Sequence, residues 1–156
     1  MKKLFALILT VAMLATMSIT AFATNTTGGS TEVSFNVDPT YTITIPATVE
    51  LNKVETEGVV TYENDYTITA EAGVRLKKNE YIEVTVASDY EMTTAEGATL
   101  AYTITKGGDE LENAVVAIFD TDKTTQTSTI HISANDPDFA GDYSDTVTFT
   151  ITVKTN

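Results

Sequence analysis

Apolar and polar residues alternate with a period of two along most of this chain, the pattern of β-strands that bury one face and expose the other. The clearest case is segment 145–154, where four apolar residues alternate with threonines: Val147, Phe149, Ile151 and Val153. Burying one such side chain stabilises a fold by about 1.5–3 kcal/mol, more than strand propensity contributes at a site. We therefore predict that core packing fixes this last strand and that these four side chains are structural residues of the core.

Shorter stretches of the same alternation predict the other strands. They lie at 33–37, 41–45, 59–62, 66–70, 82–86, 90–92, 100–104, 111–118 and 130–132, separated by Gly, Pro, Asn and Asp. Segment 52–58 reads as an acidic loop, and 109–117 is the one stretch with room for a helical turn or two. The fold class predicted is all-β, an antiparallel immunoglobulin-like β-sandwich of about seven to nine strands.

The first 23 residues have the pattern of a secretory signal peptide. Lys2 and Lys3 precede an apolar run that begins at Leu4, and the segment ends in the small-x-small sequence 21–23. A transmembrane anchor is the alternative, but the uninterrupted run is shorter than the ~20 residues that span a bilayer. We expect cleavage after Ala23, a flexible N-terminal tail at 24–30 and a single β-sandwich domain at 31–156.

Composition narrows the environment and the partners. The chain has no cysteine, so an exported fold depends on its core instead of disulfides. It has 22 acidic and 9 basic residues and a net charge of −13, which becomes −15 once Lys2 and Lys3 are removed. Such a charge repels nucleic acid and anionic lipid, so neither nucleic-acid binding nor stable membrane insertion after signal cleavage is expected. The 31 threonines suit the solvated faces of strands.

The residues that carry catalysis in known enzymes are sparse, and we predict no catalytic or cofactor-binding residue. His131 is the only histidine, and the isoleucines on either side place its side chain on the opposite, solvated face of a strand. One histidine, no cysteine and no G-x-S-x-G motif cannot form a familiar nucleophile triad. Acidic pairs are expected by chance among 22 carboxylates. The protein is therefore predicted not to be an enzyme.

Calcium is the one metal that the sequence suggests. Hard oxygen ligands occur in two predicted loops, and the candidates are Asp120, Asp122, Asp136 and Asp138. Their spacing matches no ordered calcium loop, and aspartate is also an ordinary turn residue. We favour solvated turns over a calcium site and expect no other cofactor.

Tyr143 stands in the turn before the last predicted strand. A tyrosine at such a corner can donate a hydrogen bond to the backbone of the incoming loop, as in the tyrosine corner of immunoglobulin-like sandwiches. A half-buried aromatic residue in a turn is the alternative. Either role is structural.

Two segments carry a resemblance to known families. The closing A-G-D-Y-S-D-T-V-T-F-T-I-T-V, together with D-P-T-Y-T-I-T-I-P-A-T-V near the start, resembles small secreted β-sandwich proteins of Gram-positive bacteria. The closing segment is similar to that of WxL-type wall-surface domains and of spore-coat-protein-U and pilin-like domains. The chain departs from the WxL pattern because it has no tryptophan. The resemblance implies a secreted surface sandwich and transfers no functional residue.

These observations support two hypotheses. The first is a secreted or extracellular, non-enzymatic structural or adhesion protein of the cell surface or matrix, pilin-like, whose tail and strand at 31–37 pair with the sheet edge of another copy. The alternative is a soluble extracellular module for carbohydrate or calcium-assisted ligand binding. It would use whichever tyrosines are exposed among Tyr41, Tyr62, Tyr66, Tyr81, Tyr90, Tyr102 and Tyr143. An unpaired apolar sheet edge would favour assembly, and an exposed cluster of tyrosines would favour the binding module.

Overall fold

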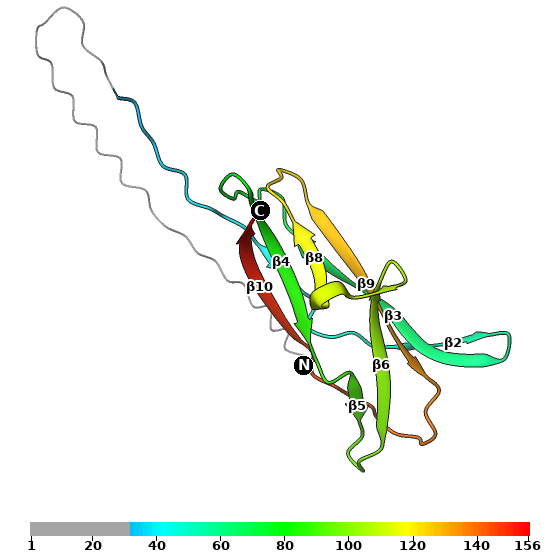
Figure 1. The fold of residues 1–156 in the computed structure, drawn as a ribbon. Coiled ribbons are helices and arrows are strands. Elements are labelled where there is room, and N and C mark those ends of the chain that lie inside the picture. Colours follow the sequence, from blue (N-terminus) through cyan, green and yellow to red (C-terminus); the bar gives the residue numbers. More distant parts are fainter. Residues whose placement is uncertain (1–31) are drawn as a thin grey trace, which may run out of the picture.

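A computed structural model of the protein describes residues 32–156, so the predicted signal peptide and the tail at 24–30 lie outside the described residues. Figure 1 shows the described part as strands with one short 3₁₀ helix, η1 (Glu112–Ala114), inside the segment where a helical turn was expected. The strands are β1 (Ile43–Thr44), β2 (Asn52–Thr56), β3 (Val59–Ala70), β4 (Glu80–Ala87), β5 (Glu91–Thr93), β6 (Thr99–Lys106), β7 (Asp109–Glu110), β8 (Val115–Phe119), β9 (Gln126–Asn135) and β10 (Thr148–Thr155). From residue 32 onward, no helix is long and apolar enough to cross a membrane.

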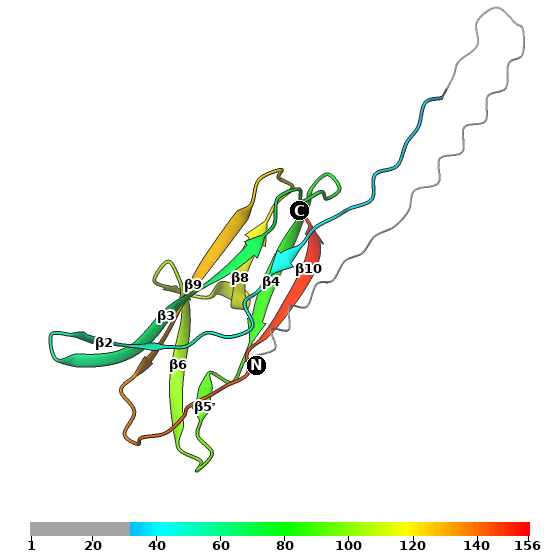
Figure 2. The ribbon, with the colours of Figure 1, turned by 180° about the vertical axis from the view of Figure 1, so that it is seen from behind.

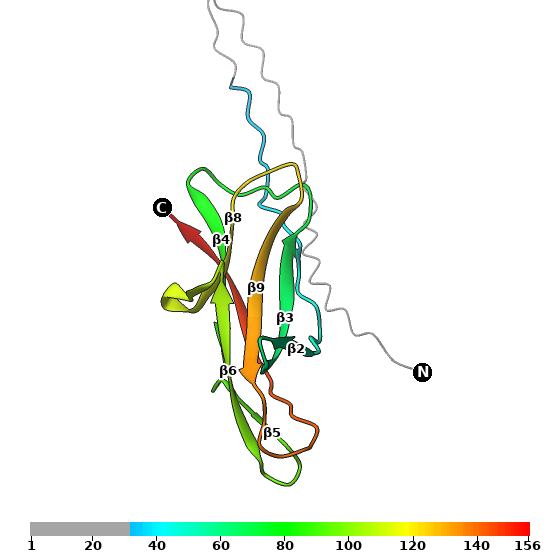
Figure 3. The ribbon, with the colours of Figure 1, turned by 90° about the vertical axis from the view of Figure 1, so that its right-hand side faces the viewer.

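The strands form two antiparallel sheets. The larger sheet has the order β1-β3-β9-β6-β5, with β2 paired to β3 and β7 to β6, and the smaller sheet has the order β10-β4-β8. Figure 3 shows the small sheet and the β3–β9 part of the large sheet as two layers. The predicted antiparallel β-sandwich is therefore confirmed.

The core lies between the two layers and follows the predicted alternation. On β3 the buried residues are Tyr66, Ile68 and Ala70, and on β4 they are Ile82, Val84 and Val86. The largest of the fully buried side chains is Phe119 of β8, which is opposite Ile82 in the register of the small sheet. The core therefore supplies the stability that the missing disulfides do not.

Segment 52–58, predicted to be an acidic loop, is instead half of a β-hairpin. β2 pairs with the first part of β3, and the turn between them is formed by Glu57 and Gly58, both with positive φ. β3 itself runs unbroken for 12 residues, joining two segments that the sequence separates. The polar residues 63–65 do not interrupt it because β9 pairs with β3 along this whole stretch.

The last strand is shorter and less buried than predicted. β10 begins at Thr148, and Val147 and Phe149 are half-buried against the core. The expectation of full burial is wrong for Ile151 and Val153, which are 39% and 38% exposed. The reason is that β10 is an edge strand of the small sheet, paired with β4 alone.

A pair of identical substitutions tests this difference in burial. Ile68→Ala, at a position that is 0% exposed, should lower the free energy of unfolding by about 2–5 kcal/mol, because it leaves a cavity in the core. Ile151→Ala should cost less than about 1 kcal/mol in the monomer, because the side chain is already in contact with water. Urea unfolding of both variants measures the two values, and equal losses would contradict the exposed edge.

Candidate assembly site

One face of β10 is apolar but only partly covered. Ile151 is directly opposite Val84 and Val153 is opposite Ile82, so all four side chains point to the inner face of the small sheet. The two β4 residues are fully buried, whereas their β10 partners are more than a third exposed. Within residues 32–156 no strand pairs with the other side of β10. We call this unpaired strand edge, with Ile151 and Val153, the β10 edge.

The beginning of β10 is anchored across the sandwich. The ring of Phe149 stacks on that of Tyr66 from β3, with centroids 5.6 Å apart and planes 5° from parallel. Beyond this stack, toward Thr155, the inner-face residues Ile151 and Val153 no longer belong to the packed core. The exposed part of the β10 edge is therefore its second half.

Residues 32–39, which we call the N-terminal segment, carry exposed apolar side chains and pair with no strand. Val33, Phe35 and Val37 were predicted to form a strand, but this segment pairs with no strand, and the three side chains are 89%, 84% and 52% exposed. The prediction of a strand is therefore wrong for the isolated subunit, in which the segment has no pairing partner. Figure 2 shows the segment leaving the sandwich and extending away from it.

The N-terminal segment leaves from the end of the sandwich at which β10 finishes. Thr40 and Arg75 exchange two backbone hydrogen bonds of 2.9 and 2.8 Å, which attach the C-terminal end of the segment to the loop after β3. At the far end of the same loop, the carbonyl oxygen of Asn79 accepts a 2.8 Å bond from the backbone N–H of Asn156.

A hydrogen-bonded cluster, which we call the Asp145 latch, holds the other end of β10. Tyr102 of β6 donates its hydroxyl to Asp145 Oδ2 at 2.6 Å, and Ser88 donates to the same oxygen at 2.7 Å. The hydrogen bond from Tyr102 lowers the pKa of the Asp145 carboxyl, while burial raises the pKa of the Tyr102 hydroxyl. The latch links both sheets to the loop before β10, and nothing in the sequence pattern marked it.

The same loop contains the predicted corner tyrosine. Tyr143 donates its hydroxyl to the carbonyl oxygen of Phe139 at 2.9 Å, four residues upstream, as a tyrosine corner does. Thr93 and Ser144 exchange two backbone hydrogen bonds, which join this loop to the end of β5. The approach to β10 is therefore defined by several local contacts.

The four calcium candidates are separated by the fold. Asp120 and Asp122 lie in the loop between β8 and β9, whereas Asp136 and Asp138 follow β9 at its other end. Asp122 caps a local turn by accepting a bond from the Thr124 N–H at 3.0 Å, and this bond lowers the pKa of its carboxyl. In the part of the chain that the structure describes, no three His, Asp or Glu side chains gather in a way that could hold a metal ion. The calcium site stays a prediction without geometric support.

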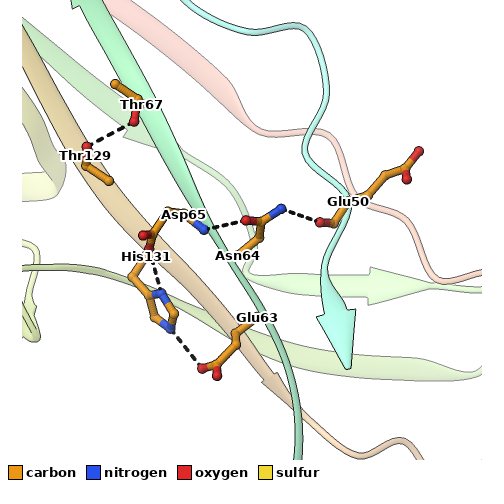
Figure 4. A network of polar contacts seen from close by, with 7 residues as sticks. All are labelled: Glu50, Glu63, Asn64, Asp65, Thr67, Thr129 and His131. Atoms are coloured by element: carbon orange, nitrogen blue, oxygen red, sulfur yellow. Dashed lines mark hydrogen bonds and ion pairs between the residues drawn. The ribbon is translucent and has the colours of Figure 1, made fainter. Parts of the chain in front are cut away.

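His131 lies on the outer face of the large sheet, as expected, but not alone. Figure 4 shows its ring between two carboxylates of β3: Nδ1 is 3.0 Å from Asp65 Oδ1, and Nε2 is 3.1 Å from Glu63 Oε2. The contact with Asp65, more than any other, raises the pKa of His131. The β3–β9 register creates this cluster, because Asp65 is directly opposite His131, and residues so far apart in sequence gave no signal of it.

No protein-family model and no curated protein matches the chain. Among solved structures, the crystal structure of the P pilus rod subunit PapA is similar, with a TM-score of 0.52 and 10% identity over 73% of this chain and 99% of that one. A structure of a chaperone–tip adhesin complex of CFA/I fimbriae also matches, with a TM-score of 0.43 and 17% identity over 72% of this chain. The chain spans 42% of that second protein. The pilin-like part of the resemblance is confirmed at the level of fold, whereas the WxL part is not.

The Asp145 latch can be tested by removing one hydroxyl. Tyr102→Phe should lower the free energy of unfolding by about 0.5–1.5 kcal/mol, because a hydrogen bond to a partly solvated carboxylate is lost. Since the folded pKa of Asp145 is depressed, its contribution is present above the unfolded value near pH 4 and is lost as pH falls through the lower folded value. The stability difference between wild type and Tyr102→Phe should therefore shrink in strong acid, as measured by urea unfolding at pH 7 and pH 2.

The His131 cluster predicts a titration that NMR can follow, since the chain has one histidine. The midpoint should lie above 6.5 and fall in Asp65→Asn, with a smaller fall in Glu63→Gln. Because the folded pKa is raised, the stabilisation is complete below about pH 6.5 and is lost as pH rises through the folded value. A midpoint at or below 6.5 would contradict the paired geometry.

Proposed function

We propose that this protein is a secreted, non-enzymatic structural subunit of an extracellular, cell-surface assembly, in which the N-terminal segment of one copy adds as a strand to the β10 edge of another. The observation that carries the proposal is the complementarity of two unpaired features of one chain. The N-terminal segment has alternating apolar residues but pairs with no sheet. The β10 edge is apolar but has no strand beside it. The pilin-like fold supports a structural role.

The sizes of the two features agree. Residues 32–37, the part of the N-terminal segment before Asp38-Pro39, would extend about 20 Å as a strand at 3.3–3.4 Å per residue. The eight residues of β10 extend about 27 Å, so this part of the segment fits along the β10 edge. Burial of Val33, Phe35 and Val37 would contribute about 1.5–3 kcal/mol each before the cost of ordering the segment. Main-chain bonds to β10 would add to this without demanding a particular sequence.

Strand addition from another copy also agrees with the path of the chain. The N-terminal segment is attached through Thr40 to the end of the sandwich where β10 finishes, and it extends outward from there (Figure 2). Pairing with its own β10 would require the chain to reverse at Asp38-Pro39. The protein would then be monomeric at every concentration. Pairing with a second copy requires no such reversal.

The tyrosines give the binding-module alternative little support. Tyr66 and Tyr102 are buried, and Tyr41, at 38%, is the one tyrosine of the described range that is exposed. The rings of Tyr90 and Tyr102 are 5.9 Å apart and tilted by 54°, so they do not form a flat platform for a sugar. Of the two features that separate the hypotheses, the unpaired apolar edge is the one present.

The proposal predicts that polar substitution of the N-terminal segment prevents assembly. Phe35→Asp should leave the protein monomeric at concentrations where wild type forms larger species, because a charge would have to be buried on the β10 edge. Size-exclusion chromatography with light scattering, and electron microscopy of the same samples, measures the difference. Val59→Asp is the matched control, since Val59 is also an exposed apolar residue, at 63%, but lies at the tip of the β2–β3 hairpin.

Assembly of Phe35→Asp to the same extent as wild type would contradict strand addition by this segment. So would a wild-type protein that stays monomeric at millimolar concentration. Unchanged urea unfolding of the Phe35→Asp monomer is expected in either case, because the Phe35 side chain is 84% exposed in the isolated subunit.

A further inference from the structure

The two ends of the sandwich differ in charge. At the end where β10 begins, segment 88–98, which includes β5, and loop 136–147 contain seven carboxylates and no basic residue: Asp89, Glu91, Glu96, Asp136, Asp138, Asp142 and Asp145. We call this the acidic end, seen at the bottom of Figure 3.

At the opposite end, loop 71–79, loop 120–125 and the end of β10 contain five of the seven basic residues in the described range: Arg75, Lys77, Lys78, Lys123 and Lys154. We call this the basic end. The same segments contain three carboxylates, Glu71, Asp120 and Asp122, and Lys154 is paired with Glu83. The excess of positive charge therefore lies on loop 71–79, with three basic residues and one carboxylate.

The N-terminal segment is attached to the basic end, and this limits how copies can meet. If the segment runs parallel to the β10 of a neighbour, the two basic ends face each other, and the exchange is reciprocal and closes a dimer. If it runs antiparallel to that β10, the basic end of the donor copy meets the acidic end of the acceptor. That contact is heterologous, so it can repeat indefinitely.

We propose that the acidic end of each copy is a docking surface for the basic end of the next copy. This inference rests on the proposed strand addition and selects one of its two directions. Like charges at facing basic ends disfavour the closed dimer, and opposite charges favour the head-to-tail polymer. The charge distribution of this chain therefore specifies an open chain of subunits in which the N-terminal segment is antiparallel to β10.

The acidic end has a hollow surface. A surface hollow lies between its two loops, lined by Ala95, Glu96, Ala140, Gly141 and Asp142. Gly141 packs so closely on Thr94 that an added Cβ would lie 2.8 Å from Thr94 Cγ2, which keeps the two loops together. Beside the hollow, Phe139 is 68% exposed and offers apolar area for the contact.

The basic end is held in a defined conformation. Arg75 exchanges backbone bonds with Thr40, and the Leu76 N–H donates to Thr121 Oγ1 at 3.1 Å. The side chains of Arg75, Lys77 and Lys78 are exposed on this fixed loop. Arg75 is paired with Thr40, the residue from which the N-terminal segment departs, and Lys77 and Lys78 follow on the same loop. Insertion of the segment would therefore bring this loop to the acidic end of the acceptor.

Charge reversal tests the docking surface. The variant Lys77→Glu with Lys78→Glu, and separately Glu96→Lys with Asp142→Lys, should each slow assembly by about tenfold at low salt, because the residues proposed to face each other then carry like charge. A chain with all four substitutions should assemble again, since these facing residues are complementary once more. An equal mixture of the two double variants should also recover, because unlike copies then alternate.

The closed dimer gives a different pattern. If basic ends face each other, Glu96→Lys with Asp142→Lys would assemble like wild type, and this result would overturn the inference. Loss of assembly in the fourfold variant would overturn it as well, provided that thermal unfolding shows the variant to be folded; an unfolded variant is replaced by the mixture of the two double variants.

Engineered disulfides separate this inference from the proposed function, since the chain has no cysteine of its own. Lys78→Cys with Asp142→Cys should give a ladder of linked oligomers on oxidation, and Lys78→Cys alone should give no dimer. Phe35→Cys with Ile151→Cys reports strand addition independently. A ladder from the second pair without one from the first would overturn end-to-end docking alone, whereas no ladder from either pair would overturn the proposed function too.

Discussion

The main constraint on this structure is that β10 is an edge strand, paired with β4 on one side only. Its pairing with β4 completes the small sheet, and the stack of Phe149 on Tyr66 ties it to the large sheet. The second half of its inner face is only partly covered, so the folded subunit has an apolar edge in contact with water. Natural edge strands are usually short, charged or covered, and β10 has eight residues with one lysine.

The two surfaces proposed to act in assembly lie at different places but belong to one geometry. The Asp145 latch and the tyrosine corner define where β10 begins and hold the acidic loops beside it. The bonds between Thr40 and Arg75 define where the N-terminal segment leaves and hold the basic loop beside that point. A charged end therefore lies beside each of the two strands proposed to pair. Main-chain hydrogen bonds alone allow parallel or antiparallel pairing, and the charges favour the antiparallel one.

Part of this arrangement was predictable from the sequence. The period-two alternation indicated the sandwich and the inner residues of β3, β4 and β9, because side chains of a strand point to alternate faces whatever the topology. The pattern failed at 52–58, where a hairpin replaced the predicted loop, and at Ile151 and Val153, which alternate correctly but are only partly covered. Alternation gives the direction of a side chain, whereas burial depends on what lies opposite.

The sequence by itself determined the fold class, the absence of disulfides and the apolar face of the N-terminal segment. Only the tertiary structure decided which strand lies at the edge, which groups meet Asp145 and His131, and that acidic and basic loops gather at opposite ends. The physical reason is that these properties depend on register and strand order between segments far apart in the chain. Local residue patterns carry no information about such distant pairing.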